Sequence, residues 1–231
     1  MISIRELAFS YRGRGSDLSS AFGMQVAEFT VPPGASTALV GPSGSGKTSL
    51  LGLIAGTLRA SSGTIVVNDQ AISNFNDGEL GRFRIRCIGQ VFQAFELLSY
   101  LTVFENVMLP WYISGIGRKA DMRKRAMALL CDVGLEWKQN AMPGELSQGE
   151  QQRVAVCRAM LNNPPVLLAD EPTGNLDQEN KQNVVDLLVE QARQNNSTLL
   201  MVTHDESLLD KFDAVLDMRH VAQALDSGSR Q

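Results

Sequence analysis

Three short stretches of the chain carry residue types that act on phosphates. The first, GPSGSGKT at 41–48, matches the pattern G-x-x-x-x-G-K-T and lies between an apolar run at 36–40 and a helical pattern from Thr48. In such a loop the glycines let backbone N–H groups curl around phosphates, while Lys47 brings a charge to the β- and γ-phosphates and Thr48 offers a hydroxyl to Mg²⁺. A merely connecting glycine loop has no use for these two residues. The stretch therefore predicts a nucleotide-phosphate site.

The second stretch, VLLADE at 166–171, is an apolar run that ends in two carboxylates. Asp170 at the carboxyl end of a buried strand can hold magnesium through its water, and Glu171 can accept a proton from an attacking water. Alone, the pair would be a solvated strand end. Beside the glycine loop it predicts metal-assisted phosphoryl chemistry.

The third stretch, ELSQGEQQRVAVCRAM at 145–160, is a Ser-Gln-Gly turn that runs into an amphipathic helical pattern. Outward-facing N–H groups and the positive end of the helix dipole suit a phosphate here as well. The chain thus has two anion-binding turns. The phosphoryl acceptor stays open at this point, because a kinase needs a pocket for a second substrate whereas a hydrolase needs only a water held in line.

The patterns around these stretches predict an α/β fold. The first two strands alternate and form a mixed or antiparallel opening, and later apolar runs alternate with helical patterns, as in parallel sheets with crossover helices. A region from about 77 to 141 has helical or irregular patterns and few strands, which predicts a helical insertion. Strands are expected at 2–11, 24–31, 36–40, 64–69, 165–170 and 197–205. Helices are expected at 48–58, 181–194 and 206–212, and after the Ser-Gln-Gly turn within 145–160.

Composition excludes several classes of protein. The net charge of -4 provides no general attraction to nucleic acid or to an anionic membrane. The three cysteines are far apart and form no metal-binding spacing, which indicates a reducing compartment. No secretory signal and no run of about 18 apolar residues is evident. Any connection to a membrane must therefore come through a partner.

Taken together, GPSGSGKT, LSQGE at 146–150, VLLADE, GNLD at 174–177 and His204 resemble the motifs of the ATP-binding subunit of ABC transporters. The resemblance covers about residues 4–220. It implies a P-loop NTPase core with an antiparallel β subdomain and a helical subdomain at about 77–160, all within a single cassette at 1–225, followed by a flexible tail at 222–231. It also implies ATP and Mg²⁺ as ligands.

The resemblance assigns roles residue by residue. Tyr11 would stack on adenine, with packing on protein alone as the rival interpretation. Gln93 would reach magnesium and the lytic water, and Glu171 would be the general base. His204 would contact the γ-phosphate, with an ordinary strand-end histidine as its rival, and Asp177 lies in a loop that crosses to another subunit. The implied nucleotide ligands are Gly41, Ser43, Gly44, Ser45, Gly46, Lys47, Thr48, Ser49, Ser147, Gln148 and Gly149, and the implied metal ligands are Thr48, Gln93 and Asp170.

Two copies of such proteins pair head to tail, so that the LSGGQ-like turn of one caps the γ-phosphate on the glycine loop of the other. The chain looks most like the branch of lipoprotein release and macrolide efflux, whose members sit on the cytoplasmic face of the membrane beneath a separate permease subunit. A few side chains around 98–101 would meet that subunit. The alternative is a soluble ABC ATPase that acts on nucleic acid or the ribosome. A small-molecule kinase is a second rival, but it would leave LSQGE and GNLD unexplained.

LSQGE departs from the family pattern at two positions. Gln148 replaces a glycine and adds bulk near the expected interface. Glu150 replaces a glutamine and would put a negative charge about one turn from a bound triphosphate. Because Ser147 and Gly149 are kept, we expect activity to survive with weaker ATP-driven pairing.

Overall fold

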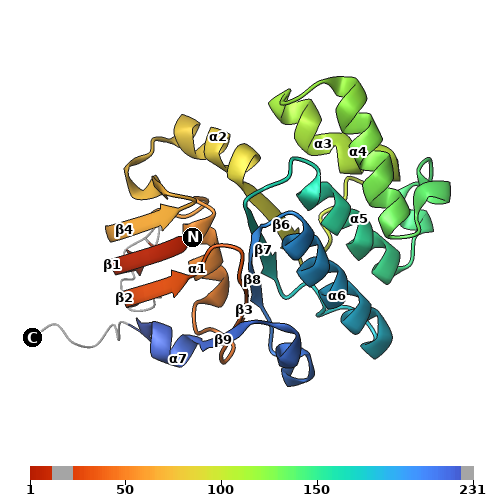
Figure 1. The fold of residues 1–231 in the computed structure, drawn as a ribbon. Helices are drawn as coiled ribbons and strands as arrows, with labels where there is room; N and C mark the ends of the chain where they lie inside the picture. Colours follow the sequence, from red (N-terminus) through yellow and green to blue (C-terminus); the bar gives the residue numbers. More distant parts are fainter. Residues whose placement is uncertain (12–22, 225–231) are drawn as a thin grey trace, which may run out of the picture.

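The computed structural model describes residues 1–11 and 23–224, which form two sheets flanked by helices (Figure 1). The first sheet is antiparallel, in the order β10-β2-β1-β4-β5. β1 (Ile2–Ser10) pairs with β2 (Gly23–Val31) from Ile2–Val31 to Ser10–Gly23. β4 (Ser62–Val67), β5 (Gln70–Ala71) and β10 (Gln223–Ala224) complete the sheet. Of the mixed or antiparallel opening expected from alternation, the antiparallel form is therefore present.

The second sheet is parallel, in the order β6-β7-β8-β3-β9. Its three central strands are the predicted apolar runs, β3 (Ser36–Val40), β7 (Val166–Asp170) and β8 (Thr198–Val202). The edge strands β6 (Ile88–Phe92) and β9 (Ala214–Asp217) were missed. β6 corrects the expectation of few strands between 77 and 141, because this segment of the predicted insertion is part of the core sheet.

The helices follow local sequence signals. α3 begins at a Thr102–Glu105 capping box and ends at Gly115, which has a φ of 63°. α1 is shorter than predicted because the chain leaves the helix at Gly56, where φ is 67°. The α-helices are α1 (Lys47–Ile54), α2 (Asp77–Cys87), α3 (Val103–Ser114), α4 (Lys119–Asp132), α5 (Gln148–Met160), α6 (Gln178–Gln194) and α7 (Met218–Val221). The 3-10 helices are η2 (Ile72–Asn74), η3 (Glu136–Lys138), η4 (Pro143–Glu145) and η5 (Glu206–Lys211), the last where an α-helix was expected.

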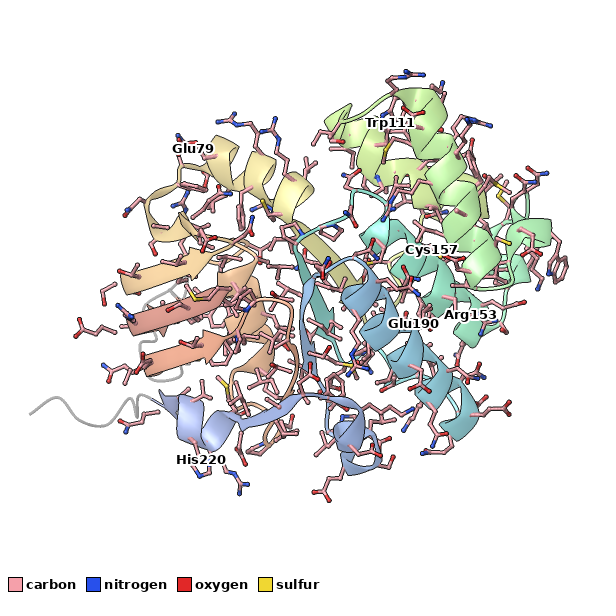
Figure 2. All side chains as sticks on the ribbon, in the orientation of Figure 1. Glu79, Trp111, Arg153, Cys157, Glu190 and His220 are labelled. Atoms are coloured by element: carbon pink, nitrogen blue, oxygen red, sulfur yellow. The ribbon has the colours of Figure 1, made fainter. Side chains whose placement is uncertain are left out.

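The parallel sheet separates two hydrophobic cores. Alternate residues of β7, Val166 and Leu168, pack with α1 and the antiparallel sheet. The residues between them, Leu167 and Ala169, pack with α3, α4, α5 and α6. α1 and α5 therefore lie on opposite faces of the parallel sheet, and side chains fill the space between the layers (Figure 2).

The α/β fold class predicted from the sequence is thus confirmed. From residue 225 onward the tail predicted at 222–231 lies outside the described residues. The three cysteines are free, and burial raises the pKa of the Cys157 thiol, which lies on α5 (Figure 2). Among the described residues, no helix has the length and apolar character needed to cross a bilayer.

Candidate nucleotide site

The glycine loop forms one wall of a pocket of about 280 Å³. The pocket is lined by Tyr11, Ser43, Gly44, Gly46, Lys47, Thr48, Ser49 and Glu171, all of which were predicted site residues. Gly44 and Gly46 have φ values of 77° and 93°, and Gly46 leads directly into α1. The N-terminus of α1 therefore faces the pocket, in the arrangement that favours a bound anion.

Two further predicted loop residues, Gly41 and Ser45, do not line this pocket. A Cβ on Gly41 would come within 2.8 Å of the Met218 Cβ and within 3.2 Å of the Ser45 Oγ. The glycine thus allows the loop to pass close to α7. Both residues therefore belong to the loop without lining the pocket.

Lys47 is the positive charge of this loop. Its side chain is buried, and its Nζ donates hydrogen bonds of 2.8 Å to the carbonyl oxygens of both Gly41 and Pro42. No carboxylate within residues 1–11 and 23–224 forms an ion pair with it. Burial raises the pKa of the nearby Asp170 carboxyl, and the Lys47 charge lowers it by less. A buried ammonium whose direct partners are carbonyl oxygens fits a ligand that brings an anion to this position.

Thr48 and Asp170 bring two oxygen atoms together. The Thr48 Oγ1 donates to the Asp170 Oδ1 at 3.3 Å. Burial raises the pKa of the Asp170 carboxyl, the bond from Thr48 opposes this effect, and the neighbouring Glu171 adds to it. Hard oxygen ligands and a carboxyl that gains from a nearby cation fit Mg²⁺. In the described part of the chain no cluster of three or more acidic, histidine or cysteine ligands occurs, so water or phosphate oxygens would have to complete the coordination of a bound ion.

Glu171 and His204 meet at the carboxyl ends of β7 and β8. His204 Nδ1 lies 3.5 Å from Glu171 Oε2, and the two side chains are 62% and 30% exposed. Glu171 has a φ of 45°, which is uncommon for a residue with a side chain, and its N–H donates to the Val202 carbonyl at 3.1 Å. The strained turn directs the carboxylate into the pocket beside the glycine loop.

Tyr11 lies at the rim of the same pocket. Its ring contacts Phe9 edge to face at 4.9 Å, its hydroxyl lies 3.3 Å from the Ser49 Oγ, and the side chain is partly exposed. An aromatic side chain at the mouth of a phosphate pocket suits stacking on a base. Stacking on adenine stays a prediction.

Gln93 contacts the loop that contains GNLD and does not line the pocket around Lys47. Its Nε2 donates to the Asn175 Oδ1 at 3.5 Å, and the Asn175 Nδ2 donates to the Gln93 carbonyl at 3.1 Å. A Cβ on Gly174 would clash with the Gln93 amide at 2.6 Å. The side chain therefore packs on the loop that contains GNLD, and its role toward magnesium and the lytic water stays a prediction.

The Ser-Gln-Gly turn is held by a capping box. The Ser147 Oγ accepts from the Glu150 N–H at 3.3 Å, and the Glu150 Oε2 accepts from the Ser147 N–H at 2.8 Å. The other oxygen of Glu150 pairs with Lys138 Nζ at 2.6 Å. Burial raises the pKa of the Glu150 carboxyl, but the bonds from Lys138 and Ser147 together hold it below its ordinary value.

These contacts correct the expectation for Glu150. Its charge is neutralised by Lys138 within the chain, and the carboxylate stabilises the start of α5. Gln148 remains the exposed departure from the family pattern. The pattern S-x-x-E could have revealed the capping box from the sequence, whereas nothing in the sequence points to Lys138, which lies twelve residues earlier on η3.

Asn180 contacts both Gly149 and Asp177. A Cβ on Gly149 would come within 2.5 Å of the Asn180 Oδ1, so a larger residue here would have to displace the Asn180 side chain. Asp177 caps α6 by accepting from the Asn180 N–H at 2.9 Å, and the bonds from Asn180 lower the pKa of its carboxyl. Neither Ser147 nor Gly149 lines the pocket around Lys47. The two anion-binding turns belong to helices on opposite faces of the sheet.

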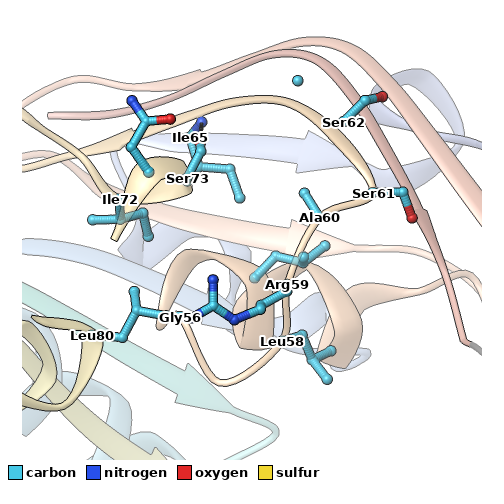
Figure 3. Close-up of a pocket in the computed structure, with 13 residues that line it drawn as sticks. Gly56, Leu58, Arg59, Ala60, Ser61, Ser62, Ile65, Ile72, Ser73 and Leu80 are labelled. Carbon is cyan, nitrogen blue, oxygen red and sulfur yellow. Dashed lines mark hydrogen bonds between the residues drawn. The ribbon is translucent and has the colours of Figure 1, made fainter. Parts of the chain in front are cut away.

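A separate pocket of about 210 Å³ lies between the end of α1 and the β4–η2 segment (Figure 3). Arg59 at this pocket is engaged within the chain, because it donates to the Phe75 carbonyl at 3.1 Å and to Asp77 at 2.6 Å. None of the predicted site residues lines it.

The parallel sheet, the glycine loop and the acidic strand end define a P-loop ATPase fold of the ATP-binding cassette type. The ABC transporter family matches residues 24–174, and the chain belongs to this family. The resemblance stated from the motifs is therefore confirmed.

Several relatives are similar over most of their length. The lipoprotein-releasing system ATP-binding protein LolD of Syntrophus aciditrophicus is 39% identical over 219 residues, which are 95% of this chain and 96% of the relative. LolD of Hydrogenovibrio crunogenus is 45% identical over 80% of each chain. The fold matches the dimeric structure of the cassette MJ0796 in a post-hydrolysis state with ADP and Pi, with a TM-score of 0.83 and 31% identity over 94% of both chains.

Proposed function

We propose that this chain is the ATP-hydrolysing subunit of an ABC transporter complex, working as a homodimer that holds two ATP molecules between its subunits. The proposal goes beyond family membership in naming the dimer, the reaction and the membrane partner. The observation that carries it is the separation of the two anion-binding turns onto opposite faces of one sheet. Each turn is half a site, and a second copy placed head to tail completes both.

Each residue of the pocket has its own role in the proposed reaction. The glycine loop and Lys47 bind the β- and γ-phosphates, and Glu171 accepts the proton of the attacking water. His204, 3.5 Å from the Glu171 carboxylate, orients that carboxylate and contacts the γ-phosphate. Thr48 and Asp170 would hold Mg²⁺, which supplies charge neutralisation on the phosphate oxygens when bound. Ser147 and Gly149 of the other subunit close the site over the γ-phosphate. Hydrolysis removes the bridging phosphate, and the dimer opens.

The membrane partner would dock in a groove of about 350 Å³ between α2, β6, α3 and α5. Phe92 and Ile113 expose apolar surface there, and Ile113 is 64% exposed. Arg84, Arg158 and Glu96 also line the groove, and both guanidinium groups donate to backbone carbonyls of this chain. The groove therefore suits a short helix of the membrane subunit through its apolar face. The stretch 98–101, where docking was predicted, does not line this groove. The protein would then lie at the cytoplasmic face of the membrane.

Purification from detergent-solubilised membranes tests the proposal. We expect ATP hydrolysis with water as the acceptor and a stoichiometric hydrophobic subunit that co-purifies with the chain. Ile113→Asp should lose that subunit and keep basal hydrolysis, because Ile113 lies outside the nucleotide pocket. RNA or DNA carried through purification in place of a membrane subunit would support the soluble alternative, and a phosphorylated small molecule would support a kinase.

A further inference from the structure

A buried glutamine joins the Ser-Gln-Gly helix to the catalytic edge of the sheet. Gln152 lies on α5, and its side chain has no solvent exposure. Its Nε2 donates to the Phe92 carbonyl at 3.2 Å and to the Pro172 carbonyl at 2.7 Å. A single amide group therefore ties α5 to two other segments of the chain.

Both carbonyls lie next to residues of the nucleotide site. Phe92 ends β6 and precedes Gln93, while Pro172 directly follows Glu171. Only the amide nitrogen can donate to two carbonyls, so the orientation of the Gln152 side chain is fixed by its partners. Within residues 1–11 and 23–224 its Oε1 has no hydrogen-bond partner, so the two donated bonds are what the side chain contributes.

Two close contacts, each between a glycine and a side chain, lie beside these bonds. Gly149 lies against Asn180 at the start of α6, and Gly174 lies against the Gln93 amide. The start of α5 thus contacts the start of α6, and the segment after β6 contacts the segment after β7, in addition to the two bonds from Gln152.

We propose that Gln152 is a positioning residue that couples the two nucleotide sites of the dimer. The inference rests on the proposed function, in which Ser147 of this chain caps the partner's nucleotide while Glu171 acts on this chain's own. Gln152 links the two within one chain, because it fixes α5 relative to the backbone beside Glu171. Occupancy of one site then changes the geometry of the other through a buried, two-bond contact.

The test replaces Gln152 with methionine, which has similar volume and no donor. The matched control is Gln191→Met, which changes another buried glutamine, on α6. We expect Gln152→Met to bind Mg²⁺-ATP within roughly twofold of the unaltered chain, because the pocket around Lys47 is unchanged. Its kcat should fall by about tenfold or more, and its Hill coefficient for ATP should fall from above 1 to about 1. Gln191→Met should keep the kcat and the Hill coefficient of the unaltered chain.

An unchanged kcat and Hill coefficient in Gln152→Met would overturn the inference while leaving the proposed function intact. An unaltered chain that neither hydrolyses ATP nor dimerises would instead refute the proposed function itself. If Gln152→Met does not fold, hydrogen exchange on chains that keep Gln152 tests the coupling between the nucleotide site and α5 instead. ATP bound to a monomeric Ser147→Arg protein should slow exchange of the amides at 149–156, and exchange that ATP leaves unchanged would overturn the coupling.

Discussion

Replacing Glu150 by alanine removes two interactions from the start of α5. The first is the capping-box bond to the Ser147 N–H at 2.8 Å, and a lost helix cap costs about 1 kcal/mol. The second is the pair with Lys138 at 2.6 Å, in which the two side chains are 18% and 16% exposed. Removing one partner of such a largely buried pair costs about 1–2 kcal/mol, less than for a fully buried one. The expected loss in free energy of unfolding is therefore about 2–3 kcal/mol.

Urea unfolding followed by circular dichroism measures this loss. Glu150→Gln keeps an acceptor for the helix cap and loses only the charge, so it should cost about 1 kcal/mol. Asp121→Ala is the control, because Arg118 and Asp121 form an exposed pair at 3.4 Å and should contribute under about 0.5 kcal/mol. A double-mutant cycle with Lys138→Met should give a coupling energy of about 1 kcal/mol. If Glu150→Ala costs no more than Asp121→Ala, the carboxylate does not stabilise this turn.

The contribution of Glu150 to the free energy of unfolding should fall at low pH. The folded-state pKa of Glu150 is lowered, so its contribution is complete above the unfolded pKa of about 4.3 and is lost as the pH falls through the folded value. The difference between the unaltered chain and Glu150→Ala should therefore shrink below about pH 4. A difference that is constant from pH 7 to pH 3 would mean that the charge of Glu150 contributes nothing.

Three further substitutions test the nucleotide site. Glu171→Gln should bind ATP and release phosphate about 10²- to 10⁴-fold more slowly, because the proton acceptor is lost while the glycine loop is intact; a normal rate in a phosphate-release assay would give the role to another residue. Lys47→Ala should weaken ATP binding about 10- to 150-fold, since a buried charged donor is removed, and calorimetry that shows unchanged affinity would exclude the pocket as the phosphate site. Gln148→Gly should raise the dimer fraction with ATP in sedimentation experiments; an equal or smaller fraction would mean that the side chain of Gln148 does not obstruct pairing.

The sequence could predict the glycine loop and the strand that ends in Asp170 because their chemistry is local. In GPSGSGKT the glycine spacing, the lysine and the threonine occur within eight residues, and the flanking apolar run is long enough to identify the strand before them. The central strands of the parallel sheet are buried on both faces, so they read as continuous apolar runs. These features need no knowledge of distant parts of the chain.

The edge strands were harder to predict because they are not buried on both faces. In β6 the sequence IGQVF has a glycine and a glutamine between its apolar residues, and in β9 the residues Ala214 and Val215 are exposed. Their pairing is decided by neighbours far away in the sequence, such as Phe92 with Asp170. Periodicity within five residues cannot supply that information.

The partners of Glu150 and Gln152 depend on tertiary structure for the same reason. Lys138 reaches Glu150 because η3 lies beside the start of α5, and Gln152 reaches Phe92 and Pro172 because α5 packs on β6 and β7. The sequence identifies these residues as polar members of a helix. Only the fold shows that Glu150 neutralises the Lys138 cation and that Gln152 joins the segments at Phe92 and Pro172.

The central claim is that each nucleotide is held between two chains, and the molar mass of Glu171→Gln in solution tests it most directly. Light scattering with and without ATP and Mg²⁺ should show one chain without nucleotide and two chains with it, because the bridging phosphate is not cleaved. Ser147→Arg in the same background should stay at one chain, since the arginine occupies the space of the trans contact. A mass of one chain under every condition, or a dimer that the arginine leaves unchanged, would contradict the account.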